Sequence, residues 1–192
     1  MSSTASEARK RNQGQQDDVS FDLSETLDVL GRTPTVVGTL LRGTSGSWHA
    51  MNEGPGTWSA SDVVGHLIHG EETDWVPRAR IILEHGEDRP FEPFDRFAQF
   101  SRFAGWSLDN LLDRFAELRH GNLETVRSWR LTEAQLERPG RHPELGPVSL
   151  RELLATWAVH DLNHVAQIAR VLAKRYTEDV GAWRVYLSIL NR

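Results

Sequence analysis

Two histidines four residues apart, His160 and His164, are the strongest chemical signal in the sequence. On a helix, residues at this spacing lie about 40° apart around the axis and about 6 Å apart along it, so both imidazoles project from the same face. Leu153, Trp157 and Ile168 continue that face as an apolar stripe. Burying polar rings in such a stripe requires a compensating partner. Hydrogen bonds in the core and a metal ion are comparable explanations for the pair, and a third ligand would favour the metal.

His66 is the candidate for a third ligand, on the apolar side of a second predicted helix. His69 follows three residues later, about 60° away around the helix axis. Gly70, four residues after His66, has no side chain and leaves room for a ligand or a facing helix. Taken alone, His66 is better explained as a hydrogen-bonded core histidine. Together with His160 and His164, it favours a metal site.

Cysteine is absent from the sequence. This absence excludes disulfides, thiolate ligands and a cysteine nucleophile. Any metal must therefore be bound by histidine and carboxylate side chains, and any thiol chemistry must use a thiol from outside the protein.

The chain has 192 residues, of which 39% are hydrophobic and 26% are charged, which is typical of one globular domain. Its net charge is −5, and its basic cluster is limited to residues 9–11, so nucleic acid is not an expected partner. No apolar segment is long enough to span a membrane, and the polar start of the chain does not resemble a signal peptide. These features predict a cytoplasmic protein without a membrane partner.

Residues 1–20 have too little apolar surface to offset the cost of ordering, so we expect a disordered tail followed by one domain over residues 21–192. Apolar periodicity predicts four long helices in that domain, and a short helix over residues 181–190 closes it. Ser24, Ser59 and Ser149 are the expected N-caps of the first, second and fourth helices, and the third helix is expected to start at Ser107 or Asp109.

Prolines predict where these helices bend. The first helix is expected to restart at Thr33-Pro34, and the second to run to Glu84 with a kink near Pro77. Residues 131–148 are expected to be irregular, and the fourth helix is expected to end near Tyr176. With no convincing strand, the pattern predicts an all-α, antiparallel four-helix bundle, in which a histidine of the second helix can face the pair on the fourth.

Five phenylalanines recur at three-residue spacing in the connection between the second and third helices. They are Phe91, Phe94, Phe97, Phe100 and Phe103. The favoured interpretation is a loop with short helical turns whose rings cover the end of the bundle. The alternative is an aromatic wall over the mouth of a pocket.

Several motifs in this order resemble the DinB/YfiT-like metalloprotein superfamily. The resemblance covers the chain from about residue 24 to the C-terminus. The order and spacing of the motifs taken together are more specific to this family than any single motif. The motifs are Trp58-Ser59 before a helix with His66-Leu67 and Glu71, Pro143-Glu144-Leu145-Gly146 before Ser149-Leu150, His160-Asp161-x-x-His164-x-x-Gln167, and Val180-Gly181.

The resemblance implies a four-helix bundle with one divalent metal bound by three histidines. Matched by motif, the ligands are His66, His160 and His164, whereas His69 is not a ligand. Zinc and nickel are the expected metals, although the order of affinities does not separate them. Glu71 matches a recurring acidic position, but it lies about 140° from His66 around the helix, so we expect it to have a structural pairing role.

Members of the family include S-transferases and isomerases that use bacillithiol, mycothiol or glutathione, so the leading hypothesis is a metal-dependent transferase that activates a small thiol for a small-molecule substrate. Fold alone does not determine the reaction. A metal-dependent hydrolase is the alternative enzyme, because His160-Asp161-x-x-His164 is similar to the HExxH motif of zinc peptidases. A third hypothesis is a non-enzymatic, stress-associated metal-binding protein. The oligomeric state is left open, with a homodimer as one option.

Metal binding by imidazole predicts a dependence on pH. The ring must be neutral to coordinate, and its ordinary pKa is about 6.5. We therefore expect the metal-dependent part of the stability to be lost below about pH 6.

Overall fold

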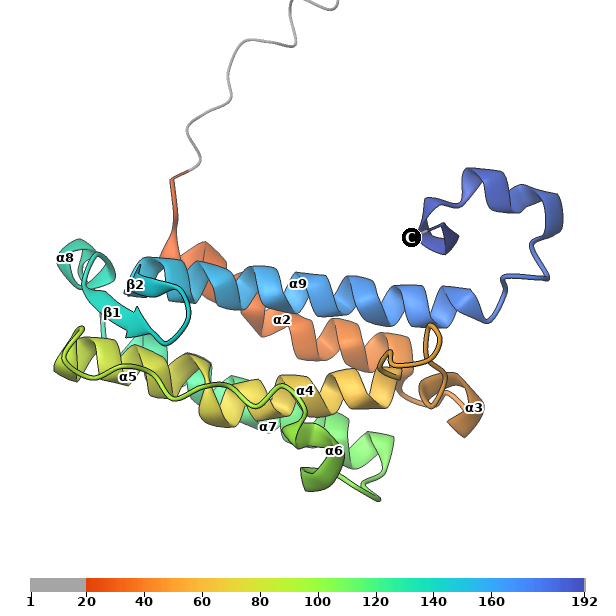
Figure 1. Cartoon of the computed structure of the whole chain (residues 1–192), viewed down its shortest axis with the longest axis horizontal. Coiled ribbons are helices and arrows are strands. Elements are labelled where there is room, and N and C mark those ends of the chain that lie inside the picture. Colours follow the sequence, from red (N-terminus) through yellow and green to blue (C-terminus); the bar gives the residue numbers. More distant parts are fainter. Residues whose placement is uncertain (1–19, 192) are drawn as a thin grey trace, which may run out of the picture.

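The computed structural model describes residues 20–191, in which four long helical segments form a bundle (Figure 1). These segments are α2 (Leu23–Leu41), α4 (Ala60–Thr73) continued by α5 (Trp75–His85), α7 (Leu108–Ser128) and α9 (Leu150–Lys174). The short elements are α3 (Gly46–His49), α6 (Ala98–Arg102), α8 (Glu133–Leu136), strands β1 (Pro139–His142) and β2 (Gly146–Ser149), and 3-10 helices η1 (Gly181–Tyr186) and η2 (Ser188–Leu190). The all-α four-helix bundle is confirmed. The tail expected over residues 1–20 lies outside the described residues, apart from Ser20.

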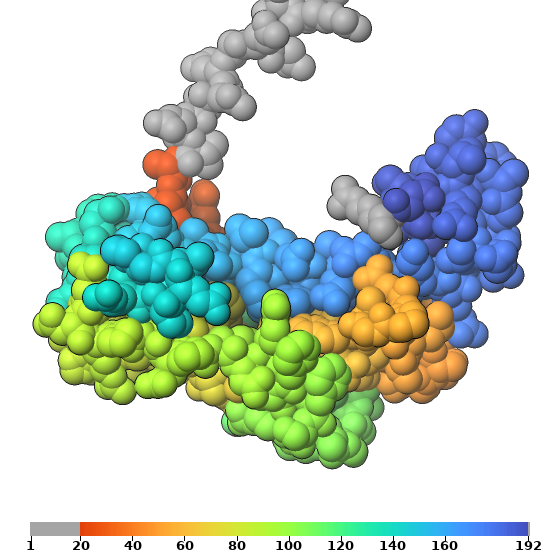
Figure 2. Space-filling model, viewed as in Figure 1, coloured from red at the N-terminus to blue at the C-terminus, as the bar shows by residue number. Residues whose placement is uncertain are grey.

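The four segments run in two directions. α2 and α9 run one way, and α4–α5 and α7 run the other way, as the colour gradient in Figure 1 shows. Each of α2 and α4 packs against both α7 and α9. Because α7 runs parallel to α4, the chain must return along the bundle between them. Residues 86–107 make this return and lie over α4 and α5 on the face seen in Figure 2, which explains the length of the Phe-rich connection.

α2 is one continuous helix, although its sequence predicted two. Its N-cap is Asp22, whose carboxylate accepts from the Glu25 N–H, so the expected cap at Ser24 is wrong. Pro34 lies inside the helix and does not restart it. A proline has no N–H, so the carbonyl four residues earlier loses its helical donor. That carbonyl belongs to Leu30, and the Arg119 guanidinium donates to it at 2.7 Å, which compensates for the missing bond.

The second expected helix is two helices, because α4 ends at Thr73 and α5 begins at Trp75. Asp74 between them has φ −110° and ψ −75°. The ring of Pro77 clashes with the carbonyl four residues earlier, which is that of Thr73, so the break occurs where the proline requires it. The capping box expected at Ser59 is present, with Asp62 as its partner.

The segment expected to be irregular between α7 and α9 contains a helical turn, α8, and a two-stranded antiparallel hairpin, β1–β2. Gly140 in β1 lies so close to α5 that a Cβ atom there would be 2.4 Å from Ile82 Cγ1. Only glycine allows this approach. The hairpin ends at Ser149, which forms the expected capping box with Glu152, and α9 then runs to Lys174, two residues short of the expected end.

The C-terminal segment forms two 3-10 turns, η1 and η2, where one short helix was expected. Figure 1 shows it projecting from the end of α9 and turning back. Leu190 is buried, whereas Trp183, Val185 and Tyr186 are exposed. Within residues 20–191, none of the helices has both the length and the apolar composition that crossing a membrane would require.

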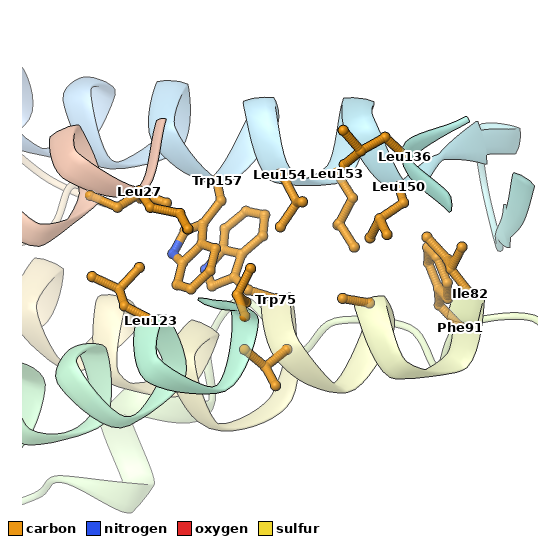
Figure 3. Close-up of a cluster of buried hydrophobic side chains, with 14 residues drawn as sticks. Leu27, Trp75, Ile82, Phe91, Leu123, Leu136, Leu150, Leu153, Leu154 and Trp157 are labelled. Carbon is orange, nitrogen blue, oxygen red and sulfur yellow. The ribbon is translucent and has the colours of Figure 1, made fainter. Parts of the chain in front are cut away.

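Two apolar clusters follow each other along the bundle. Figure 3 shows one of them, with Leu27 and Leu123 at one end and Ile82 and Phe91 at the other. Trp75 of α5 and Trp157 of α9 lie next to Leu27 and Leu123. The second cluster is formed mainly by α2, α4, α7 and the last turns of α9. In α9 the first cluster ends at Trp157 and the second begins at Ile168. The histidine pair therefore lies at the junction between the two clusters.

Candidate metal centre

Three histidines converge at this junction, one from α4 and two from α9. His66 Nε2 and His164 Nε2 each lie 3.1 Å from His160 Nε2. One ligand atom from each ring lies within 4.8 Å of the others. His66 and His164 are 6% and 7% exposed, and His160 is half-buried. The fold thus brings together the three residues that the sequence singled out, which we call the histidine triad.

The hydrogen bonds of the triad fit a metal better than they fit one another. His164 Nδ1 donates to Gln167 Oε1 at 2.8 Å, which leaves a lone pair on His164 Nε2. The single Nε2 proton that a neutral His160 could carry cannot serve both neighbouring nitrogens fully. Two nitrogens bound tetrahedrally to one Zn at about 2.0–2.1 Å lie roughly 3.3 Å apart, close to the observed 3.1 Å. The donor set and its spacing therefore suit a divalent cation.

Burial keeps His66 and His164 neutral. Desolvation, together with the charges of His164 and His160, lowers the pKa of His66 to about 3. Desolvation also lowers the pKa of His164 to about 4, with His160 contributing and the Gln167 hydrogen bond opposing the shift. Both rings are therefore unprotonated at neutral pH, which is the form that coordinates metals.

Aromatic rings surround the triad. All distances here are between ring centroids. Trp58 lies 4.8 Å from His66 and stacks parallel to His164 at 6.3 Å. Phe94 packs edge-on against His66 at 5.5 Å, and Trp75 packs edge-on against His160 at 5.0 Å. These rings limit the contact of the triad with water, which strengthens electrostatic interactions there.

The position expected to be open beside His66 is filled. A Cβ atom on Gly70 would lie 3.1 Å from Trp75 Nε1, so the glycine makes room for the indole of α5. The break between α4 and α5 places Trp75 there. The sequence left room beside Gly70 for a ligand or a facing helix, but the structure shows neither: a side chain of α5, the continuation of α4, fills the space.

Comparison with known proteins shows the family. The family model described as the DinB superfamily matches residues 8–168, which is most of the chain. The chain belongs to the DinB superfamily. A solved structure with the same fold is that of YfiT from Bacillus subtilis, described as a probable metal-dependent hydrolase with an unusual four-helix bundle topology. The TM-score is 0.70 and the identity 21%, over 84% of this chain and 93% of YfiT. No curated protein sequence matches the chain.

His69 stands apart from the triad in this DinB-superfamily chain. Its Nδ1 lies 2.9 Å from Nη1 of Arg102, which also forms an ion pair with Glu72. Burial and the charge of Arg102 lower the pKa of His69. The ring is thus held against α6, outside the group of three converging histidines.

A buried ion cluster lies beside the triad, and we call it the Arg119 cluster. Arg119 of α7 donates to Glu71 Oε1 at 2.6 Å and to Asp161 Oδ2 at 2.5 Å, and all three side chains are at most 1% exposed. Asn122 and the indole of Trp157 also donate to the Glu71 carboxylate. Burial opposes the charge of Arg119, but the two carboxylates outweigh it and raise the arginine's pKa. The structural pairing expected for Glu71 is therefore present.

Asp161 belongs to the Arg119 cluster and not to the triad. Desolvation would raise its pKa, but the neighbouring His160 ring, the charge of Arg119 and the hydrogen bonds from Arg119 lower it below its ordinary value. Its Oδ1 lies 4.0 Å from His160 Nδ1, on the side of the ring away from the other two histidines. This carboxylate cannot act as the base that the similarity to HExxH suggested, because its oxygens are already bound by a buried guanidinium.

The five phenylalanines divide between the two interpretations of their segment. Phe91 is buried at the end of the bundle, against Arg78 and His142. Phe94 lies beside the triad, and Phe100 lies 6.3 Å from Trp58. The early part of the connection thus covers the bundle end, and the middle part contributes to the wall around the triad.

Sequence reasoning missed some residues that shape the site. Gln167 was part of the family motif without a role, and its position one turn after His164 could have suggested a bond between their side chains. Arg119 gave no signal, because a charged residue on a long helix is normally solvent-exposed. Its role depends on contacts with residues far away in the chain.

Proposed function

We propose that this protein binds one divalent metal, zinc or nickel, through Nε2 of His66, His160 and His164. The observation that carries the proposal is the convergence of three imidazoles, two of them buried, whose Nε2 atoms have no better partners than one another. Three neutral ligands are typical of catalytic sites, in which a further position stays open. A structural site would be closed by four protein ligands.

We further propose that the protein is a transferase for a low-molecular-weight thiol of the bacillithiol, mycothiol or glutathione type. When bound, a divalent metal with neutral ligands lowers the pKa of a thiol or a water molecule in the open position. The chain supplies no thiol of its own because it has no cysteine. Its contribution is to orient His164 through Gln167 and to shield the site with Trp58 and Phe94.

The position of Asp161 favours the thiol over water as nucleophile. Attack by a deprotonated thiol forms a carbon–sulfur bond and releases the leaving group without a further base. Hydrolysis in the HExxH manner uses a carboxylate base, and the matching carboxylate here is paired with Arg119. A metal-dependent hydrolase remains the second candidate, favoured by the structural similarity to YfiT.

Metal content and activity test the proposal together. Purified protein should contain about one divalent metal per chain and accelerate the reaction of a chromogenic electrophile with at least one of the three thiols. His164→Ala should lose both the bound metal and the activity. It should also lose the stabilisation of the fold by metal, which for the original protein is about 2.7 kcal/mol at a metal concentration one hundred times Kd. His69→Ala is the matched control on α4, because that ring contacts Arg102 and not the triad.

The outcomes separate the candidates. Rates equal to the uncatalysed reaction with all three thiols, with metal present in the site, would contradict the transferase. Metal-dependent cleavage of an ester without thiol would then support the hydrolase. Loss of metal in His69→Ala but not in His164→Ala would contradict the ligand set itself.

A further inference from the structure

The middle of the Phe-rich connection exposes two stacked aromatic rings close to the histidine triad. Phe97 and Phe100 are 58% and 47% exposed, and their rings lie nearly parallel with centroids 6.3 Å apart. Phe100 also packs edge-on against Trp58, which lies against His66. Exposed apolar side chains that contact one another, rather than occur singly, are typical of binding surfaces. Contacts between rings thus connect this surface to the triad.

Arg96 lies between Phe97 and Phe94 in the chain, and it is exposed. Phe94 packs against His66, and Arg96 follows it by two residues, so their Cα atoms are at most roughly 7 Å apart. The backbone of this turn is held by Asp95, whose Oδ1 accepts from the Phe97 N–H at 2.9 Å. The low pKa of His66, which burial mainly causes, includes a contribution from the charge of Arg96. The guanidinium therefore lies near this ring of the triad.

Arg96 differs from Arg102, which also lies near α4 in this connection. Arg102 is paired with Glu72, whereas none of the ion pairs within residues 20–191 includes Arg96. The carboxylate of Asp95 beside it is hydrogen-bonded to the backbone instead. A divalent metal at the triad would repel this guanidinium, and a bound anion would attract both. The site therefore favours an anionic ligand.

A planar cation beside exposed aromatic rings defines the class of ligand. A guanidinium binds a carboxylate through two parallel hydrogen bonds, and an aromatic ring stacks on aromatic side chains. We propose that Arg96, Phe97 and Phe100 bind an aromatic carboxylate, with the carboxylate on the guanidinium and the opposite end of the ring towards the triad. The binding itself does not require metal. Its role in holding the electrophilic substrate rests on the transferase function proposed above.

The reaction needs a ring that carries its leaving group opposite the carboxylate. The thiolate sulfur forms a bond to that ring carbon, the bond from the carbon to a halide breaks, and the halide leaves with the bonding electrons. The proton of the thiol passes to solvent, so the step needs no oxidant or reductant. Arg96 takes no part in the bond changes. Its contribution is to hold the ring in the orientation that presents the reacting carbon.

Binding is measured in chelator-treated protein, so that the result depends neither on metal nor on transferase activity. The probes are para-nitrobenzoate and para-nitrobenzamide, which share one ring and differ in charge, titrated against the full chain by ligand-observed NMR. The benzoate should bind at least about tenfold more tightly than the amide, as expected for a hydrogen bond between charged groups. Acetate, which has the carboxylate without the ring, should bind at least about tenfold more weakly than the benzoate.

Variants at exposed positions assign the binding to these residues. Arg96→Gln should remove the preference for the benzoate over the amide, and Arg96→Lys should keep part of it. Arg89→Gln is the matched control, because it removes an exposed arginine of the same connection beside Pro90, which pairs with the hairpin. Phe97→Ser should weaken both probes, whereas Trp183→Ser, at an exposed ring of the C-terminal segment, should weaken neither.

Three binding results would overturn the proposal. The first is equal binding of the benzoate and the amide, and the second is unchanged binding of the benzoate in Arg96→Gln. The third is an equal loss in Arg89→Gln, because the preference would then come from the overall charge and not from one arginine.

Activity of the metal-loaded protein separates this proposal from the transferase itself. The reactive probes are the dinitrobenzoate with chlorine opposite its carboxylate and the matching benzamide, each compared with its uncatalysed rate for the three thiols. The benzoate should be accelerated more, and Arg96→Gln should raise its KM about tenfold with little change in kcat. If neither probe reacts although para-nitrobenzoate binds through Arg96, the binding site stands and the transferase is contradicted. Equal acceleration of both probes, unchanged in Arg96→Gln, contradicts the carboxylate site and leaves the transferase intact.

Discussion

The histidine triad and the Arg119 cluster are neighbouring groups of polar side chains inside the bundle. They differ in how completely their polar atoms are paired with other groups of the chain. Arg119 is paired with two carboxylates and with the Leu30 carbonyl. In the triad, by contrast, the Nδ1 atoms of His66 and His160 have no hydrogen-bond partner in residues 20–191. Complete pairing is expected of a cluster that holds a fold together. Converging nitrogens with incomplete pairing indicate a place for an external partner.

Adjacent residues of α9 separate the two groups. Asp161 follows His160 directly, and successive helical residues point about 100° apart. The carboxylate therefore points to α7, while the imidazole points to α4. Their closest approach, 4.0 Å between His160 Nδ1 and Asp161 Oδ1, links the structural cluster to the triad.

The largest predicted effect is on the Arg119 cluster. Arg119→Met leaves the carboxylates of Glu71 and Asp161 buried without their cation, and removing one partner of a buried pair costs about 3–5 kcal/mol. The free energy of unfolding in denaturant measures the loss. Arg127→Met is the control, because its pairs with Glu124 and Asp28 are exposed and worth at most about 1 kcal/mol. Equal losses in the two variants would show that the cluster is not the structural element described.

A smaller effect is predicted for the pH dependence of the metal-free protein. The pKa values of His66 and His164 are about 3 and about 4 in the folded state, below the unfolded value of 6.5. The unfolded chain therefore binds more protons, so the contribution to stability is present above about pH 6.5 and is lost as pH falls towards 4 and 3. Between pH 6 and pH 5 the loss is about 1 kcal/mol for each ring.

Denaturation of chelator-treated protein at a series of pH values measures this loss. The free energy of unfolding should fall less steeply between pH 6 and pH 5 in His164→Leu. The part of the slope that His66 and His164 cause together should be about halved, because one of these two rings is removed. An identical slope in the variant would contradict the low pKa of His164. The same shifts bear on the pH limit expected for metal binding. His66 and His164 stay neutral in the folded state at pH 5, so protonation of these two rings should not release the metal between pH 6 and pH 5.

The smallest predicted effect concerns the residue that orients the triad. Gln167→Leu removes the acceptor for His164 Nδ1–H, and loss of such an outer partner typically weakens metal binding at least about tenfold, or about 1.4 kcal/mol. Competition with a coloured chelator measures the change in Kd. Gln167→Glu keeps an acceptor and should restore most of the affinity. If both variants bind metal like the original protein, the bond does not orient the ring.

Much of the fold could be predicted because local interactions determine it. The capping boxes at Ser59 and Ser149 and the cap at Ser107 each involve residues within three positions of one another, so the sequence contains both partners. Apart from the N-cap of α2, which is Asp22 and not Ser24, the errors occurred where contacts between distant residues decide the structure. Pro34 remains inside α2 because Arg119, 85 positions later in the chain, donates to the carbonyl that the proline leaves free. The direction of α7 and the hairpin also depend on packing between elements.

The sequence by itself determined the chemistry that is available to this protein. The spacing of His160 and His164 places both rings on one face of a helix, and the absence of cysteine excludes sulfur ligands. Tertiary structure decided which further residue joins them, since His66 and His69 differ only by about 60° of rotation around α4. It also decided the protonation state of His66 and His164 and the pairing of Asp161 with Arg119. Burial lowers the two pKa values, and the distance between α7 and α9 allows the ion pair. Burial and this distance are defined only once the helices pack together.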